Sequence, residues 1–267
     1  MAKIGIFDSG IGGLSVLHEA LAKMPDSEFV FYADRTHAPY GEKSEDMILG
    51  YASGITRFLT QLGCGTVLIA CNTATSVAAG TLRKEYPEIP ILGMEPAVKP
   101  ALEETDGRVM VIATPVTVRE NKLKDLLARV DKDNRVDVIA MPLLVRLAEK
   151  ELFDGKEAED SIEELASAMR DRGGYTALVL GCTHFNYFRK GLKAALGDSV
   201  TLFDGNSGTV RHLSSVTGER YDASGRFSQE DPSGKTRVSY YDSGTLLEKG
   251  EELSLYSRLH ARLEEIC

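Results

Sequence analysis

The sequence VLIACNT at residues 67–73 and the sequence LVLGCTH at residues 178–184 are two near-copies of one motif. Each is an apolar run of strand length that delivers a cysteine at its carboxyl end. Cys182 follows Cys71 by 111 residues (182 minus 71), so the two thiols occupy equivalent points of two similar half-chains. Paired halves would bring the thiols face to face across one cleft. The motif therefore predicts a duplicated fold with one cysteine in each copy.

Around both motifs, short β-rich runs alternate with amphipathic segments of helical spacing. The predicted strands are residues 3–7, 28–32, 66–70 and 90–94 in the first copy and residues 108–113, 135–140, 176–180 and 199–203 in the second. Such alternation is typical of parallel sheets covered by helices on both faces. We predict an α/β protein of two pseudo-symmetric parallel-sheet domains related by internal duplication.

The segment after residue 207 differs from both copies. Residues 209–216 and 253–266 have helical spacing, and residues 237–241 form a candidate edge strand in a stretch rich in Gly and Ser. We expect this segment to return to the first copy. The first domain would then comprise residues 1–96 and 208–267, and the second domain residues 97–207.

Composition limits the classes of function. A net charge of −9 over 267 residues argues against a nucleic-acid-binding surface, which needs clustered Lys and Arg. The longest apolar runs fall short of a membrane span, and Asp8 comes too early for the apolar core of a signal peptide. Four irregularly spaced cysteines fit free thiols in a reducing compartment, and we expect a cytoplasmic protein. A second ligand pair at zinc spacing is missing, so we predict no metal site.

Polar residues gather where the predicted strands end. In open α/β sheets, ligands bind beyond the carboxyl ends of the strands. The candidates at these ends are Asp8, Ser9, Pro39, Tyr40, Gly41, Asn72, Thr73, Thr114, Thr117, Cys182, Thr183 and His184, with Glu149 farther beyond the second strand of the second copy. Their convergence on one edge of each sheet predicts a single site between the two domains.

The two cysteines favour proton transfer. Cys71 begins a predicted helix over residues 72–86, where the positive end of the helix dipole would lower the thiol pKa and Asn72 or Thr73 would cap the helix. The alternative for each cysteine is a buried structural role. Two opposed thiols can remove a proton from one side of a carbon and return one to the other side. That pattern predicts a racemase that needs no cofactor.

The remaining candidates also have structural alternatives. Asp8 could cap the helix that begins near Gly12, or it could set the protonation state of a thiol. Glu149 lies in a helix-like stretch where an exposed glutamate is common, and His184 could relay protons or begin a helix. The glycine-rich turn DSGIGG at residues 8–13 is not a dinucleotide fingerprint, and backbone N–H groups that approach a carboxylate explain it as well.

Five segments resemble the signature segments of bacterial glutamate racemases: residues 4–17, 31–41, 70–75, 93–101 and 180–185. The resemblance runs in order from residue 4 to about residue 215. It implies two pseudo-symmetric α/β domains with the active site between them, and a homodimer. It also implies interconversion of L- and D-glutamate without a cofactor, which supplies D-glutamate for peptidoglycan in cell-wall synthesis.

The same resemblance assigns roles to individual positions. Cys71 and Cys182 match the two acid/base thiols, of which Cys71 would deprotonate the D-enantiomer and Cys182 the L-enantiomer. The catalytic partners would be Asp8, His184 and Glu149. The substrate-binding residues would be Asp8, Ser9, Pro39, Tyr40, Gly41, Asn72, Thr73, Thr114, Thr117, Thr183 and His184.

Three other interpretations stay open at this point. A sister enzyme of the same fold could act on aspartate, a hydantoin or a malonate. A non-catalytic two-domain protein could close on small acids, although paired strand-end cysteines give it no advantage. A redox switch would require the two thiols to approach disulfide distance.

Overall fold

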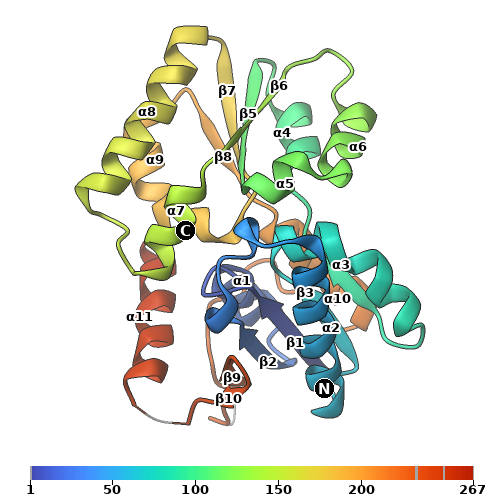
Figure 1. Ribbon diagram of the computed structural model, residues 1–267. Helices are drawn as coiled ribbons and strands as arrows, with labels where there is room; N and C mark the ends of the chain where they lie inside the picture. The colour runs from blue at the N-terminus through green and yellow to red at the C-terminus, as the bar shows by residue number, and fades with distance from the viewer. Residues whose placement is uncertain (1, 232–233, 249, 267) are drawn as a thin grey trace.

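The computed structural model describes residues 2–231, 234–248 and 250–266, and the chain forms two lobes, each built on one sheet (Figure 1). The sheet of the first lobe has the order β10-β9-β2-β1-β3-β4, and that of the second lobe has the order β6-β5-β7-β8. The strands are β1 (Lys3–Asp8), β2 (Glu28–Ala33), β3 (Thr66–Ile69), β4 (Ile91–Gly93), β5 (Arg108–Ala113), β6 (Val136–Ala140), β7 (Tyr175–Leu180), β8 (Thr201–Phe203), β9 (Val238–Asp242) and β10 (Thr245–Leu246).

Helices follow nearly every strand. The first lobe carries α1 (Leu14–Lys23), α2 (Glu45–Gln61), α3 (Asn72–Glu85), α10 (Asn206–Thr217) and α11 (Glu251–Ile266). The second lobe carries α4 (Val98–Glu104), α5 (Pro115–Arg119), α6 (Asn121–Val130), α7 (Pro142–Glu149), α8 (Lys156–Arg172) and α9 (Arg189–Leu196). Three short 3-10 helices, η1 (Arg35–His37), η2 (Tyr40–Glu42) and η3 (Thr183–Phe188), follow β2 and β7.

The predicted duplication is confirmed by the strand order. The orders β2-β1-β3-β4 and β6-β5-β7-β8 are equivalent, and all these neighbours pair in parallel. All eight predicted strands are present, and their ends differ from the prediction by no more than two residues. Helix α2 ends just before Gly63, which takes the positive φ of 83° that commonly follows a helix terminus.

The C-terminal segment returns to the first lobe, as predicted. Strand β9 pairs in parallel with β2, and α10 and α11 pack on α1. Arg237, predicted as the first residue of this strand, instead uses its buried guanidinium to donate to the carbonyl oxygens of Leu21 and Met24 at the end of α1. Helix α11 also reaches the second lobe, where Arg262 donates to the carbonyl oxygen of Tyr187.

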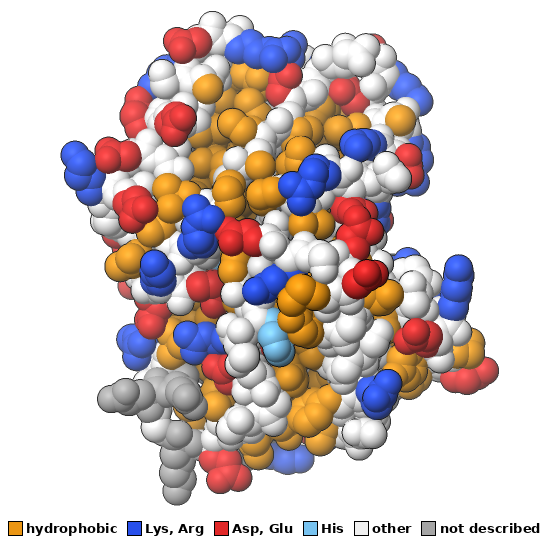
Figure 2. Space-filling view, viewed as in Figure 1, with side chains coloured by type: hydrophobic (Ala, Val, Ile, Leu, Met, Phe, Trp, Pro, Cys, Tyr) orange, Lys and Arg blue, Asp and Glu red, His pale blue; other side chains and the backbone are white. Residues whose placement is uncertain are grey.

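The lobes share apolar packing. Ile11 of the first lobe and Leu144 and Phe185 of the second belong to one cluster of buried side chains. On the face that Figure 2 shows, Lys and Arg side chains are scattered among Asp and Glu and do not gather into one basic surface. Within the part of the chain that the structure describes, no helix is both long and apolar enough to cross a membrane.

Candidate active site

The carboxyl ends of the central strands of both sheets meet at the junction of the lobes (Figure 1). Three hydrogen bonds join residues beyond these ends across the junction. Thr183 Oγ1 donates to Asp8 Oδ2 at 2.9 Å, and the backbone N–H of Ile11 donates to Glu149 Oε1 at 2.9 Å. The hydroxyl oxygens of Thr73 and Thr114 are 2.9 Å apart. The structure thus brings the strand-end residues of both copies into one buried site.

Cys71 is the N-cap residue of α3. Its Sγ accepts a hydrogen bond from the backbone N–H of Ala74 at 3.4 Å and lies 3.6 Å from Ser9 Oγ. The prediction that Asn72 or Thr73 caps this helix is wrong, because both lie inside its first turn and the thiol takes the capping position itself. A cap at this place leaves the sulfur at the positive end of the helix, pointing to the junction.

The predicted fall in the Cys71 pKa is also wrong. The side chain is only 5% exposed, and burial raises the pKa of the thiol to about 12, with the negative charge of Asp8 as the next cause. The hydrogen bond from the Ala74 N–H opposes this rise but is outweighed. Desolvation disfavours the thiolate more than one helix terminus favours it. At neutral pH this site therefore holds Cys71 as a thiol.

Cys182 has a different environment. It precedes the 3-10 helix η3, and its Sγ lies 3.6 Å from His184 Nδ1. The other ring nitrogen of His184, Nε2, lies 2.5 Å from Glu149 Oε1 at the end of α7. Burial lowers the pKa of His184, but the hydrogen bonds with Cys182 and Glu149 outweigh burial and raise the pKa well above its usual value. The imidazole therefore holds a proton beside Cys182.

Asp8 is fully buried between the two thiols. It does not cap α1, whose N-cap residue is Gly13. Its carboxylate accepts hydrogen bonds from Ser9 Oγ and the Gly10 N–H at 3.2 Å, besides the one from Thr183. Burial raises the pKa of Asp8, and the positive charge of His184 partly offsets the rise. Asp8 thus interacts electrostatically both with His184, which lies beside Cys182, and with the thiol of Cys71.

The glycine-rich turn lets the lobes approach each other. A Cβ atom on Gly10 would lie 1.8 Å from Glu149 Oε1, and one on Gly12 would lie 2.4 Å from Thr183 Oγ1. The backbone N–H groups of the turn donate to the carboxylates of Asp8 and Glu149. The turn therefore binds carboxylates of the protein itself, and a nucleotide is not needed to explain it.

A group of hydroxyls lies on the other side of the thiols. Thr117 Oγ1 lies 3.0 Å from Thr114 Oγ1 and 3.3 Å from Thr73 Oγ1, and all three side chains are buried. Asn72 Oδ1 is buried there as well and has no hydrogen-bond partner among the described residues. The three hydroxyls can donate to an anionic ligand such as a carboxylate, whereas the unsatisfied Asn72 Oδ1 is an acceptor and is suited to an N–H donor such as an ammonium group.

Pro39, Tyr40 and Gly41 follow β2 in and beside η2. The Tyr40 hydroxyl donates to Asp34 Oδ2 at 2.5 Å, so its phenol group is already occupied. Gly41 lies against the second lobe, where a Cβ atom would be 2.7 Å from Thr114 Cβ. Pro39 is partly exposed in the same loop.

Sequence reasoning missed Asp34, Arg35 and Asp242. Arg35 Nη1 donates to Asp242 Oδ2 at 3.1 Å, and Arg35 Nε lies 3.9 Å from Glu149 Oε2. All three residues stand at the carboxyl ends of β2 and β9, so the strand-end rule applied to these strands would have found them.

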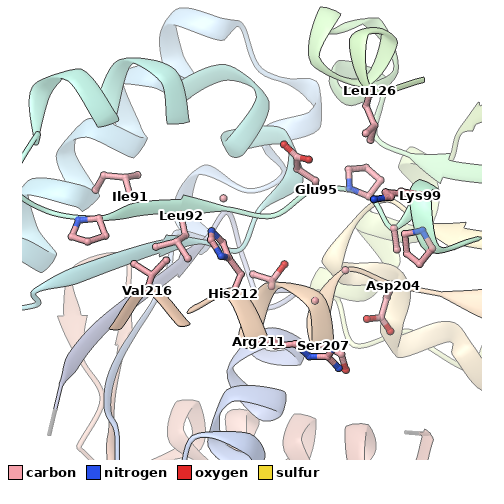
Figure 3. Close-up of a pocket in the computed structure, with 18 of the residues that line it drawn as sticks. Ile91, Leu92, Glu95, Lys99, Leu126, Asp204, Ser207, Arg211, His212 and Val216 are labelled. Carbon is pink, nitrogen blue, oxygen red and sulfur yellow. The ribbon is translucent and has the colours of Figure 1, made fainter. Parts of the chain in front are cut away.

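A large cavity lies elsewhere. It has a volume of about 1240 Å³ and lies between β4, α4 and α10, where Figure 3 shows Leu92, Lys99 and Arg211. It contains none of the predicted site residues. Cys71 and Cys182 are only 5% and 6% exposed. Within the described residues, no group of three or more His, Cys, Asp or Glu side chains is placed to hold a metal ion.

The chain is similar to known racemases over almost its whole length. The family model of Asp/Glu/hydantoin racemases matches residues 9–213. Glutamate racemases of Lachnospira eligens and Campylobacter curvus are 43% and 45% identical to the chain, and each alignment covers 99% of this chain and 98% of the relative.

Solved structures of glutamate racemases have the same fold as this chain. Escherichia coli glutamate racemase superposes with a TM-score of 0.77 at 25% identity over 92% of this chain and 99% of that chain. The Thermus thermophilus enzyme superposes with a TM-score of 0.71 at 30% identity over 99% of this chain and 94% of that chain. The chain therefore belongs to the Asp/Glu/hydantoin racemase family, within its glutamate racemase group.

Proposed function

We propose that this protein interconverts L- and D-glutamate without a cofactor, with Cys71 and Cys182 as opposed acid and base at Cα. One observation carries the proposal: the two thiols face one junction in opposite electrostatic environments. Burial and Asp8 keep Cys71 protonated, whereas a protonated His184 lies beside the sulfur of Cys182. A two-base racemase needs one thiol and one thiolate at the start of each turnover.

The reaction then proceeds by two coupled proton transfers. With L-glutamate bound, the Cys182 thiolate takes the Cα proton, and the Cys71 thiol gives its proton to the opposite face of Cα. The enzyme is left with a Cys71 thiolate and a Cys182 thiol, which is the form that accepts D-glutamate. Asp8 and His184 lie beside the two sulfurs and stabilise these alternative states.

The carbanion that forms at Cα needs fixed donors, because an amino acid without a bound electron sink has a very weakly acidic Cα–H. The hydroxyls of Thr73, Thr114 and Thr117 are placed to donate to a substrate carboxylate in a buried site, and Asn72 Oδ1 is placed to accept from the substrate ammonium. Ser9 and Thr183 lie beside the thiols, and Asp8 is suited to the substrate ammonium. Pro39, Tyr40 and Gly41 would close the same space from the first lobe.

The wider role follows from the reaction. We assign residues 1–96 and 208–267 to one domain and residues 97–207 to the other, which would separate to admit the substrate. The D-glutamate formed would serve peptidoglycan synthesis and hence cell shape. We place the enzyme in the cytoplasm, because the cell-wall precursors that receive D-glutamate are assembled there. We also propose a homodimer, as the resemblance to glutamate racemases implies.

Solvent deuterium incorporation at Cα tests this function. We expect both L- and D-glutamate to exchange Cα–H and racemise in D₂O without added cofactor. The Cys71→Ser and Cys182→Ser variants should each lose racemisation by a factor of 10³ or more, on the order of the loss when one member of a catalytic pair is removed. Exchange of aspartate but not glutamate would overturn the substrate, and exchange of neither would favour a protein that only binds small acids.

A further inference from the structure

A partly buried arginine of the first lobe, Arg35, lies next to Glu149. Arg35 lies in η1, directly after β2, and its Nη1 is bound to Asp242 Oδ2 of β9. Its Nε lies 3.9 Å from Glu149 Oε2, is buried, and has no hydrogen-bond partner among the described residues. The Asp242 carboxylate thus holds the guanidinium in place, and the unsatisfied Nε–H is left near the Glu149 carboxylate.

The two oxygens of Glu149 have different neighbours. Oε1 contacts His184 Nε2 and accepts the Ile11 N–H, whereas Oε2 lies toward Arg35. A carboxylate held at both oxygens cannot rotate away from the imidazole without losing one of these contacts. The contacts form a continuous series from the C-terminal segment to a thiol: Asp242, Arg35, Glu149, His184 and Cys182.

We propose that Arg35 is a positioning residue for racemisation, which orients Glu149 toward His184 and, together with Asp242, sets the charge that the Cys182 side of the site experiences. The inference rests on the two-thiol function proposed above. Arg35 forms ion pairs with Glu149 and Asp242, so it acts on the site through its contact with Glu149 and through its charge. The C-terminal segment, which supplies Asp242, thereby takes part in tuning the reaction.

Several titratable groups surround this ion pair. They are Asp8 on β1, Glu149 on α7, His184 and Tyr187 on η3, Asp242 on β9, Tyr256 on α11, and Cys182 before η3. The charge of Glu149 raises the pKa of His184. By Coulomb's law, a positive charge at Arg35, whose Nε lies 3.9 Å from Glu149 Oε2, acts in the opposite direction. Loss of the Arg35 charge therefore raises the pKa of His184 further, and loss of the Asp242 charge lowers it.

The pH dependence of kcat/KM separates this role from a structural one. In Arg35→Met, the limb of the kcat/KM profile that reports His184 should move to higher pH by about one unit. Coulomb's law gives a shift of this size for one charge removed roughly 10 Å away at an effective dielectric constant of about 20. In Asp242→Asn, the same limb should move to lower pH. The double variant should return toward the wild-type profile, and Arg35→Lys should keep that profile.

Arg146→Met is the matched control. Arg146 lies on the same helix as Glu149 and forms an ion pair with Glu42 of the first lobe, 2.5 Å apart and largely exposed. Its loss removes a charge and a contact between the lobes without touching Glu149. We expect its pH profile to match that of the wild type.

Opposite shifts in the two single variants support the inference. Shifts in one direction, or unchanged profiles in folded and active variants, would overturn it. If circular dichroism shows that Arg35→Met does not fold, Asp242→Asn and Arg35→Lys decide the same question. If the Cys71→Ser or the Cys182→Ser variant still racemises glutamate at the wild-type rate, the two-thiol function is refuted, and this inference with it.

Discussion

Gly12 is the position where one added methyl group tests the contact between the lobes most directly. Its φ is not positive, so alanine brings no backbone strain of its own. The new Cβ would lie 2.4 Å from Thr183 Oγ1 and 2.5 Å from His184 Nδ1. Ordinary contact begins at 3.4 Å, so η3 must move away from the first lobe by about 1 Å.

That displacement disturbs both sides of the site. Thr183 would lose its hydrogen bond to Asp8, and His184 would lose its alignment with the Cys182 sulfur. Overpacking of this size costs about 1–3 kcal/mol of unfolding free energy. A misplacement of about 1 Å at a reacting group lowers the rate by about 10²-fold. We therefore expect Gly12→Ala to fold, to lose part of its stability and to lose most of its activity.

The assay combines urea unfolding with deuterium exchange at Cα of both glutamate enantiomers. Gly50→Ala is the matched control, because Gly50 lies within α2 and a Cβ there meets no atom within 4 Å. That variant should gain about 0.5–1 kcal/mol and keep full activity. If Gly12→Ala retains wild-type stability and exchanges within about threefold of the wild-type rate, the close packing of the lobes is not required for catalysis.

Two further predictions follow from buried ionisable groups. Glu149→Gln removes the negative charge beside His184, so the pKa of His184 falls, and kcat should fall about tenfold or more, as the pH profile of kcat would show. Burial lowers the pKa of His18 to about 4 and that of His260 to about 3, and their Nδ1 atoms lie 3.1 Å apart. Because the unfolded histidines bind protons near pH 6.5, their contribution to stability is complete above that pH and falls by about 3 kcal/mol for each histidine, or about 6 kcal/mol together, toward pH 4. Melting temperatures between pH 7 and pH 4 measure this loss, and a flat profile in wild type, or an unchanged slope in His260→Phe, would contradict it.

Much of the fold was predictable because its signals are local. The apolar run that leads to Cys71 and the one that leads to Cys182 are each short enough to be identified by composition alone, and their equal placement in two half-chains indicates the duplication. The strand-end rule then selects residues such as Asp8, Thr114 and Thr183, since parallel strands end at one edge of a sheet. These inferences require no knowledge of which side chains touch.

Other properties depended on contacts between distant segments. The raised pKa of Cys71 follows from burial of the thiol and from the charge of Asp8, which a helix-terminus argument leaves out. Glu149 has the sequence context of an exposed helical residue and becomes a partner of His184 only because α7 docks on the glycine-rich turn. Arg35 lies in the signature segment of residues 31–41, but its contacts with Asp242 and Glu149 join segments that are far apart in the chain.

The sequence by itself determined the α/β class, the repeat, and the presence of one strand-end cysteine in each half, because the period of hydrophobicity and the end of a strand are properties of neighbouring residues. The tertiary structure alone decided which charges surround each thiol and that Cys71 is held as a thiol. Desolvation and Coulomb interactions depend on distances between lobes, and a linear chain does not specify those distances until it has folded.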